Sequence, residues 1–156
     1  MTTYVLNIGE VKTFNSSVTF TCYGLGSCVG LFMQDRAKGI AGGAHILLPS
    51  DEAGPECKDK WYNVRHAIDR ILDEFKTLGS GLEGLRAKVT GGASVLGINF
   101  NTGSRNTQSV MDELIRRKIY IAALDVGGTL ARTAHFISDT GVMMVKTPVC
   151  SSYKIF

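Results

Sequence analysis

Four short segments in the first third of the chain have the composition of β-strands. Each is rich in β-branched or aromatic residues and is bounded by turn residues, mainly glycine, of which the chain has 18 against three prolines. The segments are residues 4–8, 18–23, 28–32 and 40–48. Two of them contain the runs CVGLF and HILL, which are apolar on both faces of a strand and are expected to lie inside the protein.

The longest amphipathic helix is predicted at residues 60–78. Apolar side chains recur there at steps of three and four, which is the spacing of one helix face. They are Trp61, Val64, Ile68, Ile71, Leu72, Phe75 and Leu78. Gly79 suits the C-terminal cap of this helix.

The rest of the chain alternates between strands and one more helix. A strand is predicted at 86–90, a helix at 106–117 with Asn106 suited to its N-cap, and a strand at 119–126. Residues 133–138 and 142–146 flank Asp139-Thr140-Gly141, a connection typical of a β-hairpin. This order of elements predicts one α+β domain, residues 1–156, with the tail after about residue 148 left unassigned.

Composition limits the class of protein. The chain has 156 residues, 44% of them hydrophobic and 20% charged, which suffices for one substantial core. The formal charge of +3 is spread without a dense basic run, so no nucleic-acid partner is expected. No apolar stretch is long enough to cross a bilayer, and residues 1–10 do not have the order of a signal peptide. We therefore expect a soluble, cytoplasmic protein without membrane insertion and with reduced cysteines.

The glycine-rich segment GLGSCVG, residues 24–30, is the most informative for chemistry. It places Cys28 after a tight turn, where backbone N–H groups around Ser27 and Cys28 can stabilise an oxyanion. A dinucleotide fingerprint would need glycine in place of Val29 and a helix afterwards, and the chain has no P-loop lysine at this point. The segment therefore fits a nucleophile better than a phosphate cradle.

A nucleophilic cysteine needs a base, and the chain has three histidines. His45 follows small residues in a predicted strand and is the best candidate. His66 falls on the polar side of the long helix and is most simply a surface residue. His135 alternates with apolar neighbours and fits an ordinary sheet residue.

Each of the four cysteines also has a simpler interpretation than catalysis. A buried cysteine such as Cys28 is more often a small core residue than a nucleophile, and Cys22 fits packing within a strand. Cys57 fits an exposed thiol in a polar loop, whereas Cys150 lies in the unassigned tail. A zinc site formed by Cys22, Cys28, His45 and Cys57 lacks any paired ligand spacing, so no metal or cofactor is expected.

Several motifs in order give the chain a resemblance to a known family. With GLGSCVG, AHILLP, TGGAS, NTGSRN and DVGG followed by Ala131-Arg132, it resembles the CheD family of bacterial chemoreceptor glutamine deamidases. The resemblance implies an α/β/β layered sandwich similar to the deamidase domain of cytotoxic necrotising factor toxins. It also implies a catalytic pair, Cys28 and His45, oriented by a threonine.

The chain departs from the family at that third residue. The family has threonine six positions before the cysteine, where this chain has Cys22, with Thr21 one residue further away. Strand alternation points Thr21 to the other face unless a bulge intervenes. Cys22 is therefore the candidate orienting residue for His45, with a weaker hydrogen bond than a hydroxyl gives. Val126 also stands where the family often has threonine.

The resemblance implies hydrolysis of receptor glutamine to glutamate through a thioester on Cys28. His45 is expected to raise the thiolate fraction, so that Cys28 reacts below the pH of an ordinary thiol. Cleavage of glutamyl methyl esters is an expected side activity. The implied partners are the cytoplasmic helices of methyl-accepting chemoreceptors and the CheC phosphatase. The alternative is a docking module that binds receptors or CheC and catalyses weakly.

Overall fold

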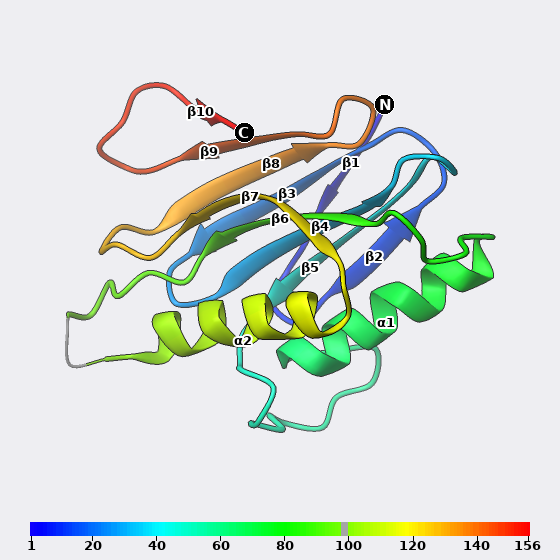
Figure 1. The fold of residues 1–156 in the computed structure, drawn as a ribbon. Helices are drawn as coiled ribbons and strands as arrows, with labels where there is room; N and C mark the ends of the chain where they lie inside the picture. Colours follow the sequence, from blue (N-terminus) through cyan, green and yellow to red (C-terminus); the bar gives the residue numbers. More distant parts are fainter. Residues whose placement is uncertain (98–99) are drawn as a thin grey trace.

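The computed structural model describes residues 1–97 and 100–156, which form two helices and two mixed sheets (Figure 1). The outer sheet has the strand order β1 (Thr2–Val5), β3 (Val18–Leu25), β8 (Arg132–Ile137), β9 (Val142–Lys146) and β10 (Lys154–Ile155). The central sheet has the order β2 (Val11–Phe14), β5 (Ile40–Ile46), β4 (Val29–Asp35), β6 (Arg86–Gly91) and β7 (Tyr120–Val126). The helices are α1 (Val64–Thr77) and α2 (Thr102–Arg116).

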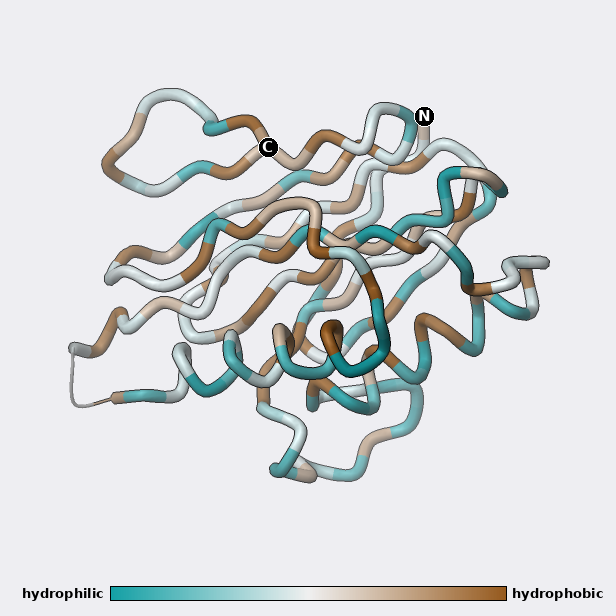
Figure 2. The backbone as a smooth tube through the Cα atoms, in the orientation of Figure 1, coloured by the Kyte–Doolittle hydropathy of each residue, from teal (hydrophilic) through white to brown (hydrophobic). Residues whose placement is uncertain are grey.

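Strands β4 and β5 in the middle of the central sheet are buried on both faces. Val29, Leu31 and Met33 of β4 pack in one core with the buried faces of α1 and α2. Phe32, between them on the strand, packs in a second core with β3, β8 and β9 of the outer sheet. The molecule therefore has three layers, helices against the central sheet and the central sheet against the outer sheet (Figure 1). Figure 2 shows hydrophobic stretches along the strands and an alternation of hydrophobic and hydrophilic residues along both helices.

Two neighbouring glycines of β5 show how closely the layers approach. A Cβ atom at Gly42 would lie 2.9 Å from the ring of Phe75 on α1. A Cβ atom at Gly43 would point the other way and lie 2.7 Å from Leu6 Cδ1, with the ring of Phe20 at 3.1 Å. Because consecutive strand residues face opposite sides, both layers contact the sheet at this point.

The predicted α+β class and both helices are confirmed, with different boundaries. Helix α1 begins at Val64 because the Asn63 side chain caps it, accepting a 2.8 Å hydrogen bond from the His66 backbone N–H. Gly79 follows the end of this helix with a φ of 99°, as its predicted capping role requires. The hairpin of β8 and β9 is also confirmed. No described helix is long and apolar enough to cross a membrane.

Three expectations about elements were wrong. Strand β2 was not predicted, because VKTF is short and half polar, and it is stabilised by antiparallel pairing with β5. The first strand runs from Thr2 to Val5 rather than over 4–8 because it pairs in parallel with β3. Helix α2 begins at Thr102 rather than at Asn106, since Gly103 lets its first turn lie against the backbone of Gly92. Asn106 is therefore inside the helix and is not its N-cap.

The substitution Gly43→Ala tests the packing of the layers. The new methyl group would collide with Leu6 and Phe20, so we expect the free energy of unfolding to fall by about 1–3 kcal/mol in chemical denaturation. Gly81→Ala is the matched control, because nothing lies within 4 Å of its Cβ position. An equal effect of the two substitutions would contradict the close approach of the layers.

Candidate active site

The turn that carries Cys28 is fixed by hydrogen bonds to three consecutive carbonyl groups. The Gly26 carbonyl accepts from Ala93 N at 2.8 Å, and the Cys28 carbonyl accepts from Gly92 N at 2.9 Å. The Ser27 carbonyl between them accepts from the side-chain Nδ2 of Asn106 at 2.9 Å. Two of the carbonyls are therefore held by the β6–α2 connection and the third by α2 itself.

This arrangement leaves donors available on the turn. Within the described residues, the backbone N–H groups of Ser27 and Cys28 donate to no carbonyl of another residue. The Cys28 N–H instead lies close enough to its own thiol to favour the thiolate. Two N–H groups that donate to no carbonyl, next to a sulfur nucleophile, are the donor set that an oxyanion hole requires.

The sheet register places His45 beside Cys28. His45 of β5 is directly opposite Gly30 of β4, and Cys28 precedes Gly30 by two residues. Cys28 lies in the turn directly before β4 and packs in the core between the central and outer sheets. The Gly30 Cβ position points to the same core, 3.6 Å from the Cys22 sulfur, so His45 opposite it faces this side as well. Diagonal neighbours of this kind have Cβ atoms about 7 Å apart or less, within reach for an imidazole. Gly30 has no side chain to separate them.

The His45 ring has a defined tautomer. Its Nδ1 lies 2.9 Å from the backbone oxygen of Leu6. Because a carbonyl oxygen can only accept, Nδ1 carries the proton and Nε2 has a lone pair. Nε2 is buried and has no hydrogen-bond partner among the described residues. His45 thus has an unpaired acceptor nitrogen, Nε2, as a general base requires.

Burial sets the charge state of both residues. It raises the pKa of the Cys28 thiol from 9.0 to about 11, against the opposing effect of its own backbone N–H. Burial also lowers the pKa of His45 below 6.5, although the Leu6 carbonyl and Glu10 oppose the shift. At neutral pH the free protein therefore holds a neutral thiol and a neutral imidazole. This differs from the expectation of a preformed thiolate, because desolvation outweighs the local donors.

The two candidates for an orienting residue lie on opposite faces of β3. Cys22 is fully buried between the sheets, with its sulfur 3.6 Å from the Cβ position of Gly30. It makes no hydrogen bond to His45 in the described part of the chain. Thr21 faces away, and its hydroxyl is hydrogen-bonded to His135 Nδ1 at 2.8 Å. The bulge in β3 begins only after Cys22, so it does not turn Thr21 inward. The Leu6 carbonyl holds Nδ1 instead.

The other cysteines and histidines lie apart from this pair. Cys57, Cys150 and His66 are exposed, as expected for Cys57 and His66. His135 Nε2 lies 3.2 Å from the Tyr153 hydroxyl on the outer face of the outer sheet. No three His, Cys, Asp or Glu side chains are grouped to hold a metal ion within residues 1–97 and 100–156.

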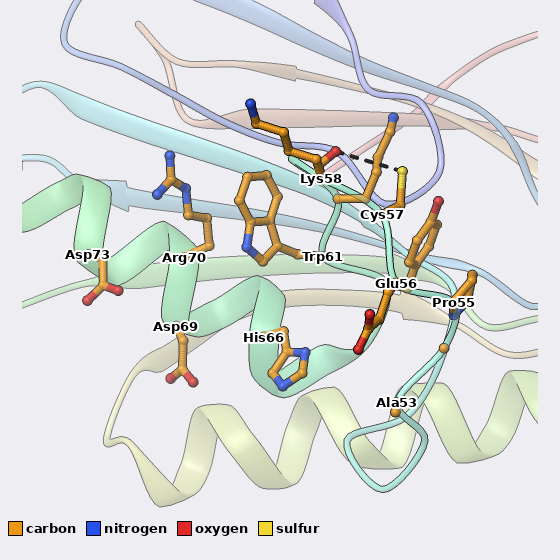
Figure 3. Close-up of a pocket in the computed structure, with 13 residues that line it drawn as sticks. Ala53, Pro55, Glu56, Cys57, Lys58, Trp61, His66, Asp69, Arg70 and Asp73 are labelled. Carbon is orange, nitrogen blue, oxygen red and sulfur yellow. Dashed lines mark hydrogen bonds between the residues drawn. The ribbon is translucent and has the colours of Figure 1, made fainter.

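A surface hollow beside α1 is separate from the Cys28 and His45 pair. It has a volume of about 730 Å³ and lies between the loop before α1 and the first turns of that helix (Figure 3). Trp61 and Arg70 line it and stack on each other, with the guanidinium 4.8 Å from the ring centre. Its walls carry both acidic and basic side chains and do not include Cys28 or His45. Cys28 and His45 are instead buried.

Two contributors to the site were not predicted from sequence. The Leu6 carbonyl is a backbone atom, which leaves no signal in residue identity. Asn106 did leave one, since it is three residues after Gly103 and four before Val110, within the stripe of α2 that faces the core. A polar residue in such a stripe indicates a buried hydrogen-bonding role.

The charge states predict how the thiols react. Iodoacetamide is expected to label Cys28 only at high pH, with labelling that rises toward a midpoint of about 11. Peptide mass spectrometry over a pH series measures each site, and unfolded protein, in which all four thiols are exposed, provides the control. Labelling of Cys28 at lower pH in the folded than in the unfolded protein would indicate a thiolate–imidazolium pair and contradict this description.

Comparison with known proteins identifies relatives over most of the chain. The family model described as CheD chemotactic sensory transduction matches residues 47–147. A probable chemoreceptor glutamine deamidase CheD of Desulfitobacterium hafniense is 34% identical over 150 residues, covering 92% of this chain and 93% of the relative. The chemoreceptor glutamine deamidase CheD of Thermotoga maritima is 32% identical over 143 residues, covering 91% and 90%. That of Halalkalibacterium halodurans is 34% identical over 150 residues, covering 91% of each chain.

These matches include the segments in which the sequence motifs lie. Alignments that cover nine-tenths of the chain span the Cys28 turn, the His45 strand and the β6–α2 connection that holds the turn. This chain is therefore a member of the CheD family, whose curated relatives are protein-glutamine deamidases.

Proposed function

We propose that the chain converts glutamine side chains of bacterial chemoreceptors to glutamate, with Cys28 as the nucleophile and His45 as the general base. The observation that carries this proposal is the unpaired Nε2 lone pair of His45 on the same sheet face as the Cys28 thiol. Family membership supplies the substrate class, since relatives are named chemoreceptor glutamine deamidases.

The first chemical step forms a carbon–sulfur bond. The Cys28 sulfur attacks the carboxamide carbon of glutamine while its proton passes to His45 Nε2. Because the resting pair is neutral, this transfer accompanies the attack and no thiolate needs to accumulate. The substrate oxygen becomes an oxyanion, and the N–H groups of Ser27 and Cys28 are the donors placed to stabilise it.

The next steps release ammonia and then glutamate. The imidazolium of His45 returns its proton to the departing nitrogen, so the carbon–nitrogen bond breaks and a thioester remains on Cys28. His45 then takes a proton from water as the water oxygen attacks the thioester carbon. The carbon–sulfur bond breaks, the thiol regains its proton, and glutamate leaves. The Leu6 carbonyl supports both proton transfers by fixing the tautomer and the ring plane of His45.

The same thioester can form from a glutamyl methyl ester, with methanol leaving in place of ammonia. Methylesterase side activity therefore belongs to the proposal. The residues of the site provide nucleophile, base and oxyanion donors by themselves, so the proposed reaction uses no metal or cofactor.

An apolar edge beside the nucleophile turn suits a receptor helix. Val95 lies against Gly26, 3.4 Å from its Cβ position, and is 46% exposed. Leu96 next to it is 74% exposed. Exposed apolar side chains of this kind fit the apolar face of an amphipathic helix, the structure that the expected receptor substrate presents.

The direct test is incubation of a receptor cytoplasmic fragment with the protein, followed by peptide mass spectrometry. The mass increase of amide-to-acid conversion should occur with unmodified protein and with Cys57→Ala, and be absent with Cys28→Ala and His45→Gln. Conversion that survives Cys28→Ala would exclude this nucleophile. Binding of the fragment or of CheC without conversion would instead support a docking module.

The pH dependence follows from the neutral base. His45 acts only when unprotonated and burial lowers its pKa, so kcat/KM should stay constant through neutral pH and fall only below 6.5. Glu10 opposes the lowering, so Glu10→Gln should move the acid limb to still lower pH. Deamidation rates over a pH series, with circular dichroism to confirm folding, measure both. An acid limb at or above 6.5 would contradict the proposal.

A further inference from the structure

The side chain of Asn106 joins the two segments that carry Cys28 and His45. Its Nδ2 donates one 2.9 Å hydrogen bond to the Ser27 carbonyl, directly before the nucleophile. It donates a second 2.9 Å hydrogen bond to the Leu47 carbonyl, two residues after the base. Asn106 is 0% exposed, so both bonds lie in an environment where they are not exchanged for water.

The chemistry of the partners fixes the orientation of the amide. Both carbonyl oxygens can only accept, so the nitrogen of the amide must face them. Its oxygen is then left buried and without a partner among the described residues. A buried unpaired amide oxygen is costly, and α2 nevertheless carries asparagine between Gly103 and Val110 in its buried stripe. The two donated bonds are the feature that an apolar residue could not provide.

The other hydrogen bonds to the turn that carries Cys28 are donated by backbone N–H groups, and they join this turn to the β6–α2 connection. Ala93 N and Gly92 N donate to the Gly26 and Cys28 carbonyls and, within the described residues, to no carbonyl of β5. Beyond residue 46 the strand leaves its regular pairing with β4, and Leu47 N donates to Tyr62 instead. Asn106 therefore links the two segments at the point where the backbone pairing between β4 and β5 ends.

We infer that Asn106 is a positioning residue, which sets the distance between the Cys28 thiol and His45 by bridging the Ser27 and Leu47 carbonyls. The inference rests on the proposed function for its kinetic consequence. Fixing the Ser27 carbonyl also fixes the plane of the Ser27–Cys28 peptide bond, so it directs the Cys28 N–H away from Asn106. One side chain thus orients both the nucleophile and an oxyanion donor.

The test compares Asn106→Ala with Val110→Ala, one turn further along the buried stripe of α2. Both substitutions remove buried atoms and should lower the melting temperature, but Val110 packs in the helix-side core and bonds to neither segment. Asn106→Ala should lower kcat about a hundredfold, the scale of a misplacement of about 1 Å. Its KM should stay within about threefold, since substrate contacts are retained. Val110→Ala should leave kcat within about twofold.

A second readout does not depend on deamidation. Loosening the Ser27–Cys28 segment exposes the thiol, so Asn106→Ala should move the midpoint of Cys28 alkylation from about 11 toward the ordinary value of 9.0, whereas Val110→Ala should not. Failure of the unmodified protein to deamidate receptor would overturn the proposed function and leave this readout to decide the role of Asn106. Unchanged kcat and midpoint in a folded Asn106→Ala variant would overturn the inference.

Asn106→Asp separates hydrogen bonding from packing. It conserves shape but replaces the two amide donors with an acceptor that faces two carbonyl oxygens. A positioning role predicts that it loses activity at least as severely as Asn106→Ala. Recovery of kcat by Asn106→Asp would show that only the volume of the side chain matters. If Asn106→Asp does not fold, Asn106→Ser, which has a single shorter donor, should give a kcat between those of alanine and asparagine.

Discussion

Burial of β4 and β5 on both faces is the constraint on which the site depends. Strand β4 contributes Leu31 to the helix-side core and Phe32 to the core between the sheets, so no face of this strand is left to solvent. Cys28 and His45 lie at the end of the face that packs in the core between the sheets, and they are 7% and 3% exposed. The architecture that stabilises the domain therefore also removes water from Cys28 and His45.

Desolvation then determines the chemistry. An exposed cysteine–histidine pair could exist as an ion pair, but here burial disfavours both charged forms, raising the pKa of Cys28 and lowering that of His45. A neutral imidazole needs a defined tautomer to act as a base, and the Leu6 carbonyl provides it. A backbone atom rather than a side chain thus holds Nδ1, while Cys22 packs in the core between the sheets.

The sequence predicted the elements and residues that have a periodic or compositional signal. The α+β class, helix α1, the β8–β9 hairpin and exposed Cys57 and His66 all follow from local pattern. Strand β2 has no such signal and exists because of its pairing with β5. The Leu6 carbonyl could not be predicted, since its role depends on where the chain passes rather than on its side chain. Asn106 was interpreted as a cap because NTGSRN also fits a helix start, and only the packing of Gly103 on Gly92 shows that the helix begins earlier. The roles of Cys28 and His45 remain predictions from sequence, strengthened by the register that makes them neighbours.

The tautomer and charge of His45 form the central claim, and nitrogen NMR of the imidazole measures both directly. Protein labelled with ¹⁵N at histidine, compared with His66→Gln and His135→Gln for assignment, should show His45 with a protonated Nδ1 and an unprotonated Nε2 at neutral pH. That pattern should persist below pH 6.5, where an exposed histidine is already half protonated or more. A His45 ring that carries its proton on Nε2, or is an imidazolium at neutral pH, would contradict the account.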